Sequence, residues 1–62
     1  MNVLIIGAGG PVAAAAIKAL EQYHTLRLAD IKELESEHET LTVDITDTAQ
    51  VLEAASGMDV II

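Results

Sequence analysis

Three of the four glycines in the chain fall within four residues, at Gly7, Gly9 and Gly10. They follow residues 2–6, a short aliphatic run of the kind that forms a strand buried on both faces. Pro11 comes next and fits the first turn of a helix, where its missing N–H costs nothing. The cluster is therefore predicted to be a tight turn between a buried strand and a helix.

The segments after this turn continue to alternate between helix and strand. Residues 12–22 have helical spacing, and their apolar side chains form one stripe, which comprises Val12, Ala13, Ala16, Ile17 and Leu20. Residues 25–30 and 40–44 predict two further strands. Between them, residues 31–39 are acidic and polar, and we expect them to form a loop.

The last third of the chain predicts a capped helix followed by a fourth strand. Asp47 can cap the helix, and Gln50 three residues later completes a capping box. The apolar side chains expected to point inward are Val51, Leu52 and Ala55. Gly57 is expected to end the helix as its C′ residue, and residues 59–62 begin the strand.

The glycine-rich turn has the chemistry of a phosphate-binding loop. Glycine has no Cβ, so a pyrophosphate can approach the main chain closely. The helix that begins near Pro11 would direct free N–H groups and its positive dipole end at the phosphates. As G-x-G-x-x-G the motif fails at Val12. As G-x-x-G-x-x-G it gives Gly7, Gly10 and Ala13, which is the better fit.

Asp30 ends the second predicted strand, close to the ~20-residue spacing at which an acid binds the adenine ribose hydroxyls. A carboxylate there would repel a 2′-phosphate, so the sequence favours NAD over NADP as the cofactor. The competing interpretation is that Asp30 only makes a strand end soluble. The agreement of motif, spacing and strand order favours the ribose role.

Three segments resemble the extended short-chain dehydrogenases/reductases, the NAD-dependent epimerase/dehydratase group. They are residues 3–13 (VLIIGAGGPVA), residues 26–31 (LRLADI) and residues 43–47 (VDITD). The resemblance implies that Asp44 meets the adenine amino group and that Ile45 lies beside it. The cofactor-binding residues are then Gly7, Gly9, Gly10, Pro11, Val12, Asp30, Ile31, Asp44 and Ile45.

The resemblance covers only the cofactor half of such a protein. Ile6 stands where the family often has threonine. The family's Tyr-x-x-x-Lys pair and its serine or threonine are absent, since Tyr23 is followed four residues later by Arg27. We expect Tyr23 to be a packing residue at a helix end. Catalytic residues would lie beyond Ile62, and none is assigned in this chain.

The order β-α-β-loop-β-α-β predicts an α/β fold with a Rossmann-type parallel sheet. The chain has 62 residues, no cysteine and 52% hydrophobic residues, which is much aliphatic content for so small a surface. It also stops within a predicted strand. We therefore expect residues 1–62 to be the N-terminal part of a single NAD(P)-binding Rossmann domain, incomplete within a larger doubly wound domain.

Charge and hydropathy exclude several classes of partner. Ten acids oppose three bases, for a net charge of −7, so no basic face is available for nucleic acid or an anionic membrane. No apolar stretch reaches the roughly 18 residues of a membrane span. The apolar first twenty residues lack the basic start of a signal peptide. The expected location is the cytoplasm.

The two histidines invite a catalytic or metal-binding interpretation. His24 is expected in a surface loop. His38 lies among Glu35, Glu37 and Glu39, but such a run is usually a solvated loop, and no metal site is predicted. A homo-oligomer of the parent protein is compatible with the sequence.

The function expected from these features is that of the NAD(P)-binding segment of an epimerase/dehydratase-like oxidoreductase acting on a sugar-like or small carbonyl substrate. One alternative is a module that senses NAD(P) without turnover. Another is a saccharopine-dehydrogenase-type oxidoreductase. The N-terminal sequence of those enzymes resembles residues 6–10, but they favour glycine at the position of Val12. The 62 residues alone are expected to be inactive, to bind NAD weakly or not at all, and to self-associate.

Overall fold

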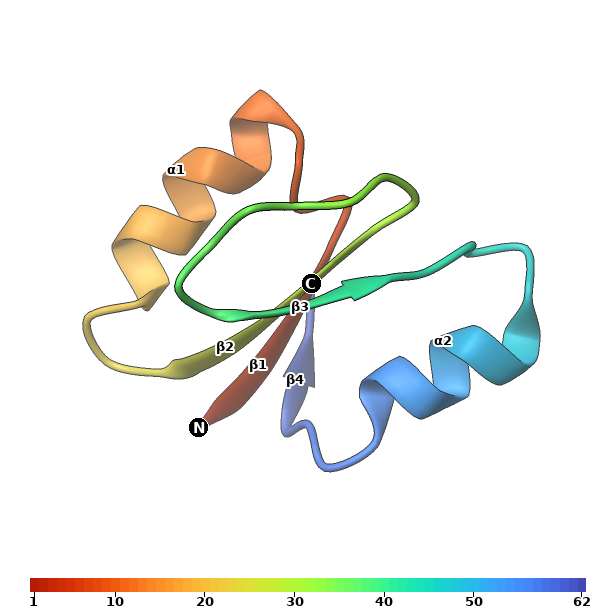
Figure 1. Ribbon diagram of the computed structural model, residues 1–62. Helices are drawn as coiled ribbons and strands as arrows, with labels where there is room; N and C mark the ends of the chain where they lie inside the picture. Colours follow the sequence, from red (N-terminus) through yellow and green to blue (C-terminus); the bar gives the residue numbers. More distant parts are fainter.

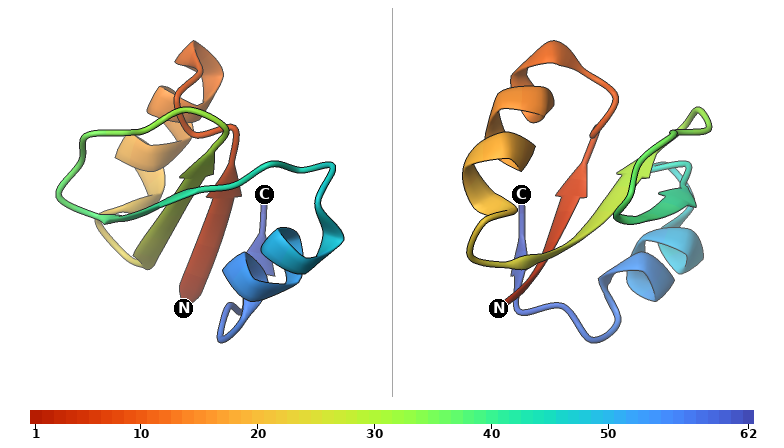
Figure 2. Two further views of the ribbon diagram at one scale, coloured as in Figure 1. Left: turned by 45° about the vertical axis from the view of Figure 1, so that its right-hand side comes forward. Right: turned by 60° about the vertical axis from the view of Figure 1, so that its left-hand side comes forward.

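A computed structural model describes all of residues 1–62 and contains one four-stranded sheet with a helix on each face (Figures 1 and 2). The elements are β1 (Asn2–Ile6), α1 (Pro11–Leu20), β2 (Thr25–Asp30), β3 (Glu39–Thr42), α2 (Thr48–Ala55) and β4 (Val60–Ile61). The strand order is β3-β2-β1-β4, and every pair is parallel. The predicted α/β fold with a Rossmann-type parallel sheet is confirmed. No helix in it is long and apolar enough to cross a membrane.

The central strand β1 is covered on both sides, which explains its unbroken aliphatic sequence. Val3 and Ile5 face α1, whereas Leu4 and Ile6 face α2. Leu4 is fully buried and Ile5 is 2% exposed. Successive side chains of a strand point to opposite faces, so β1 contributes to two separate cores at once.

Each core joins strand side chains to one helix. On the α1 side the buried residues are Val3, Ile5, Ala8, Leu26 and Leu28, packed against Ala13, Ile17, Leu20 and Leu34. On the α2 side they are Leu4, Ala29, Val43 and Ala54, packed against Ile6, Leu41, Val51, Ala55 and Met58. Leu34 comes from the segment between β2 and β3, which is a loop as predicted, and it anchors that loop to the α1 side.

The inward stripe of α1 is narrower than predicted. Ala13, Ile17 and Leu20 pack on the core at i, i+4 and i+7 spacing. The prediction for Val12 was wrong, because Val12 lies in the first turn of the helix, off this stripe, and is 85% exposed. Tyr23 is also 77% exposed and does not pack at the helix end.

A similar correction applies to α2. Val51, Ala54 and Ala55 face the sheet at i, i+3 and i+4 spacing, and Met58, which follows the helix, packs on the same core. This spacing turns Leu52 outward, where it is 69% exposed, so its predicted inward position was wrong. The small Ala54 takes the buried position instead and allows α2 to approach the sheet closely.

The ends of the elements follow the predicted signals with small shifts. Asp47 is the N-cap of α2 and accepts hydrogen bonds from the amides of Ala49 and Gln50, at 3.0 and 3.3 Å. Gly57 follows α2 with φ +78°, as expected for a C′ glycine. The β4 pairing extends to Ile62, whose N–H donates to Leu4 O at 2.8 Å.

Candidate functional site

The predicted site residues gather at one edge of the sheet, where β1, β2 and β3 have their carboxyl ends (Figure 1). Ligands of open parallel sheets bind outside this edge. A mainly apolar pocket of about 220 Å³ lies there. Its lining residues are Ile6, Gly7, Asp30, Ile31, Val43 and Ile45. Residues far apart in the sequence thus form one concave surface.

The turn after β1 requires glycine at its first position. Gly7 has φ +73°, in the left-handed region that residues with a Cβ rarely adopt. The next residue, Ala8, is buried, and its N–H donates to Ala29 O at 3.0 Å. The Gly10 N–H donates back to Gly7 O at 3.2 Å. These backbone bonds hold the turn against the end of β2.

Gly9 has a structural role that the preferred glycine spacing did not assign to it. A Cβ at Gly9 would lie 2.9 Å from Asp30 Oδ2 and 3.0 Å from Leu34 Cδ2. It would also lie 3.1 Å from Lys32 Cε. By contrast, a Cβ at Gly10 would meet only a carbonyl oxygen of the turn, at an ordinary 3.5 Å. A Cβ at Gly9 would therefore displace the ends of these three side chains, including the Asp30 carboxylate that accepts the Gly9 N–H.

Asp30 lies at the rim of the pocket with its carboxylate fixed by two backbone donors. Oδ2 accepts the Gly9 N–H at 2.8 Å, and Oδ1 accepts the Lys32 N–H at 3.2 Å. These bonds, with a smaller contribution from the Lys32 charge, lower the pKa of Asp30 below its ordinary value. The group is an anion at neutral pH, and its remaining lone pairs can accept hydrogen bonds from hydroxyl groups.

The first turn of α1 presents free amides beside the glycine turn. Gly10 is the N-cap and provides no side-chain cap, and the first turn contains no acidic residue. The N–H groups of Val12 and Ala13 donate to no group of the chain. Unpaired amides and the positive end of the helix dipole together favour an anion at this position.

The loop after β3 forms the opposite wall of the pocket. Asp44 Oδ1 accepts the Thr46 side-chain hydroxyl at 2.7 Å and the Thr46 N–H at 2.9 Å. Both bonds lower the pKa of Asp44, the hydroxyl more strongly. Ile45 and Ile31 line the pocket while remaining 67% and 69% exposed. Two exposed apolar side chains across a pocket can hold a flat ring between them.

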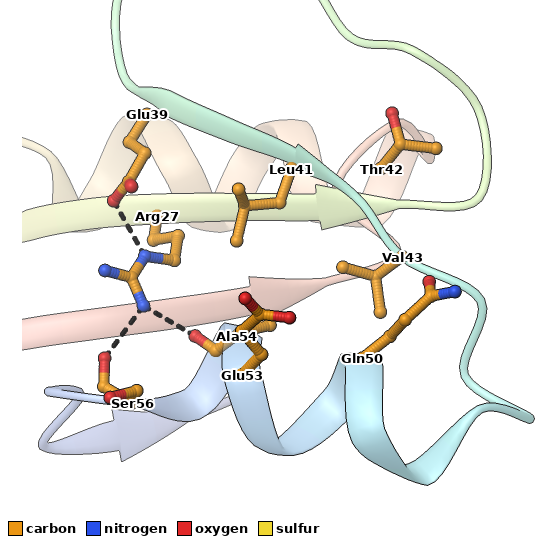
Figure 3. A pocket seen from close by; sticks show the side chains of 9 residues that line it. All are labelled: Arg27, Glu39, Leu41, Thr42, Val43, Gln50, Glu53, Ala54 and Ser56. Atoms are coloured by element: carbon orange, nitrogen blue, oxygen red, sulfur yellow. Dashed lines mark hydrogen bonds and ion pairs between the residues drawn. The ribbon is translucent and has the colours of Figure 1, made fainter.

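A second, larger pocket of about 500 Å³ lies between α2 and the strands β2 and β3 (Figure 3). Arg27 is its central cation, a residue to which the sequence analysis gave no structural role. Its Nε donates to Glu39 Oε1 at 2.7 Å, and its Nη1 donates to Ala54 O at 2.7 Å and Ser56 O at 2.9 Å. Arg27 thereby links the end of α2 to β3, and these bonds give it a structural role.

The two histidines lie away from the pocket at the sheet edge. His38 Nε2 is 2.9 Å from Glu21 Oε2, so His38 links the loop after β2 to the end of α1. His24 Nδ1 lies 3.4 Å from the amino group of Met1. Neither histidine joins a cluster of three potential metal ligands.

The fold is similar to that of solved dehydrogenases. Uronate dehydrogenase from Agrobacterium tumefaciens matches 97% of the chain with a TM-score of 0.87 and 28% identity, and a mutant of it complexed with NAD matches equally well. A short-chain dehydrogenase/reductase superfamily protein from the same organism, with bound NAD, has a TM-score of 0.85 and 24% identity over 98% of the chain. Comparisons with family models and with curated proteins gave no match.

Fold and site together define a Rossmann-type α/β segment with a pocket at the carboxyl ends of its parallel strands. The similarity to uronate dehydrogenase and to a short-chain dehydrogenase/reductase superfamily protein agrees with the family resemblance found in the sequence. The chain spans 24% of the length of uronate dehydrogenase and 19% of the length of the superfamily protein. The match therefore covers nearly all of this chain but only about a quarter or less of each neighbour.

Proposed function

We propose that the chain binds the ADP half of NAD, as the cofactor-binding segment of an epimerase/dehydratase-like oxidoreductase. The observation that carries the proposal is the position of Asp30. Its anionic carboxylate is fixed by the Gly9 and Lys32 amides at the rim of an apolar pocket. An acceptor so placed, beside a glycine turn and a free helix N-terminus, fits a ribose next to a pyrophosphate.

In this proposal each part of the site takes one part of the nucleotide. The turn at Gly7 to Gly10 and the first turn of α1, including Pro11 and Val12, hold the pyrophosphate. Asp30 accepts hydrogen bonds from the adenine ribose hydroxyls. The adenine ring lies between Ile31 and Ile45, with its amino group near Asp44. NAD supplies hydride transfer when bound, and these residues bind and orient it.

The NAD preference follows from charge. A 2′-phosphate would bring further negative charge next to the Asp30 carboxylate, which the two backbone bonds keep ionised. Two of the similar structures carry NAD, which supports the same preference.

We propose a sugar-like or small carbonyl compound as the substrate of the whole protein. The support is the similarity to uronate dehydrogenase, at 28% identity. The alternative, a module that senses NAD(P) without turnover, would use the same cofactor site and is separated from the oxidoreductase by the assay below.

The test is calorimetric titration of the protein expressed from its complete gene, followed by an NADH-formation assay with uronates and aldoses. We expect NAD to bind more tightly than NADP, and Asp30→Asn to weaken NAD binding about tenfold or more. Glu33→Gln, an exposed acid of the neighbouring loop, is the matched control and should change little. Absence of NAD binding would overturn the proposal, and binding without turnover of any carbonyl substrate would favour the sensor.

A further inference from the structure

The side-chain amide of Gln50 spans the loop that forms one wall of the candidate pocket. Its Oε1 accepts the Asp44 N–H at 2.9 Å, and its Nε2 donates to Asp47 Oδ2 at 3.2 Å. The orientation of the amide follows from chemistry, because an N–H group needs an acceptor and a carboxylate needs a donor. Gln50 therefore bridges the first and last residues of the 44–47 loop.

This contact differs from the capping box that the sequence predicts. In a capping box the side chain at this helix position bonds the N-cap amide. Here the Asp47 N–H donates to Asp44 O at 3.0 Å, and Gln50 reaches past it to the amide of Asp44. The glutamine thus stabilises the loop as well as the start of α2.

The bonds within the loop determine which polar groups remain free. The Asp44 N–H donates to Gln50, and Asp44 Oδ1 accepts two hydrogen bonds from Thr46. Asp44 Oδ2 accepts no bond, and the Ile45 N–H donates to no group of the chain. The loop thus leaves one acceptor and one donor on adjacent residues, the second of which lines the pocket.

An acceptor next to a donor discriminates between purine bases. Adenine presents an amino donor beside a ring-nitrogen acceptor, whereas guanine presents a carbonyl acceptor beside an N–H donor. A loop with this pattern matches adenine, and it would leave groups unpaired against guanine, which is unfavourable in a desolvated site.

We infer that Gln50 is a positioning residue that sets the purine selectivity of this pocket, by holding the 44–47 loop in the form that leaves Asp44 Oδ2 and the Ile45 N–H free. The inference rests on the proposed function, since it concerns the same pocket. It goes beyond that function by assigning base selectivity to a residue of α2 that does not line the pocket.

A role limited to helix capping makes a different prediction. Helix capping alone would change stability and would affect all nucleotides equally. A positioning role changes the ratio of adenine to guanine affinity, and it depends on an acceptor at this position. Gln50→Ala removes both bonds. Gln50→Lys can still pair with Asp47 but offers no acceptor to the Asp44 N–H. Gln50→Glu keeps the acceptor and loses the donor.

The experiment measures the dissociation constants of AMP and GMP for the protein expressed from its complete gene. We expect Gln50→Ala and Gln50→Lys to weaken AMP binding about fivefold, the effect of one lost hydrogen bond, and to leave GMP unchanged. Gln50→Glu should keep the AMP-to-GMP ratio within about twofold of the unsubstituted protein. Glu53→Gln, one turn further along α2, is the matched control and should keep both constants.

The outcomes separate the inference from the proposed function. If the unsubstituted protein binds no AMP, the proposed function fails, and the inference fails with it. If AMP binds but Gln50→Lys keeps the same ratio, only the inference is overturned. Equal weakening of AMP and GMP would also overturn it, because that result indicates a purely structural role for Gln50.

Discussion

The two halves of the candidate site are held by different kinds of interaction. In the turn half, Gly7 has a left-handed backbone and Gly9 packs against Asp30 so closely that a Cβ would lie 2.9 Å from the carboxylate. In the base half, the loop after β3 is held by side chains, chiefly Gln50 on the Asp44 amide at 2.9 Å. The conformation of the turn half thus depends on backbone geometry, whereas the conformation of the base half depends on side-chain hydrogen bonds.

This difference predicts which substitutions should change stability and which should change nucleotide binding. A change in the turn half alters backbone geometry, so stability and nucleotide binding should change together. In the base half, a change in an exposed side chain that lines the pocket removes contacts with the ligand only, so binding should change while stability stays nearly the same. The predictions below test this separation.

The largest effect is expected from reversing the charge at the ribose position. Asp30→Ser combined with Ile31→Arg removes the carboxylate that repels a 2′-phosphate and adds a cation that can bind one. The NAD-to-NADP affinity ratio should fall about 100-fold in calorimetric titrations, corresponding to two changes of roughly 1.4 kcal/mol each. An unchanged ratio would contradict the ribose assignment. Glu53→Arg, which makes the same change of net charge at an exposed position of α2, serves as the charge control.

A smaller effect on stability separates the glycines of the turn. Gly7→Ala forces a residue with a Cβ to adopt φ +73° and should lower the free energy of unfolding by about 1–2 kcal/mol. Gly10→Ala should cost less, because its Cβ would meet only an ordinary contact at 3.5 Å and its φ is −85°. Urea denaturation measures both. Equal destabilisation by the two substitutions would mean that the backbone conformation of Gly7 is not decisive.

A binding change without a stability change is expected in the base half. Ile45→Ala removes an exposed apolar wall of the pocket and should weaken NAD binding about fivefold, by loss of roughly 1 kcal/mol of apolar burial. The melting temperature should hardly change, since Ile45 is 67% exposed. Leu52→Ala, at 69% exposure on the outer face of α2, is the matched control. Loss of stability with Ile45→Ala would break the proposed separation.

The smallest effect concerns pH. Hydrogen bonds lower the pKa values of Asp30 and Asp44 below their ordinary 3.8. A lowered pKa in the folded state stabilises the protein above the unfolded pKa, and this contribution is lost as the pH falls through the folded value. Urea midpoints should therefore be level between pH 5 and pH 7 for these groups and decline below about pH 4. Asp30→Asn should reduce the decline, and a midpoint that rises on acidification would contradict the assignment.

The turn half was largely predictable from the sequence. An aliphatic run, a glycine cluster and an acid about 20 residues later correspond to local backbone rules, and the structure brings Gly7 and Asp30 together as expected. The contact of Gly9 with the segment after β2 was not predictable, because it depends on how the loop that carries Leu34 folds back.

The base half was harder to predict. Asp44 and Ile45 were located only through the family resemblance, and Gln50 was expected to cap its own helix rather than bond the Asp44 amide. The wrong inward assignments of Val12 and Leu52 have a related cause. Hydrophobic spacing specifies a helix, but the rotation of a short helix against the sheet is set by packing contacts that the sequence does not show.

The most direct test of the ADP site at the carboxyl edge is an amide NMR titration of the complete-gene protein with ADP. If the account is correct, shifts among residues 1–62 will cluster at residues 7–12, 30–31 and 44–46, and they will weaken in parallel in Asp30→Asn. Shifts that instead cluster around the pocket between Arg27 and Glu53, or no shifts in this segment at saturating ADP, would contradict it.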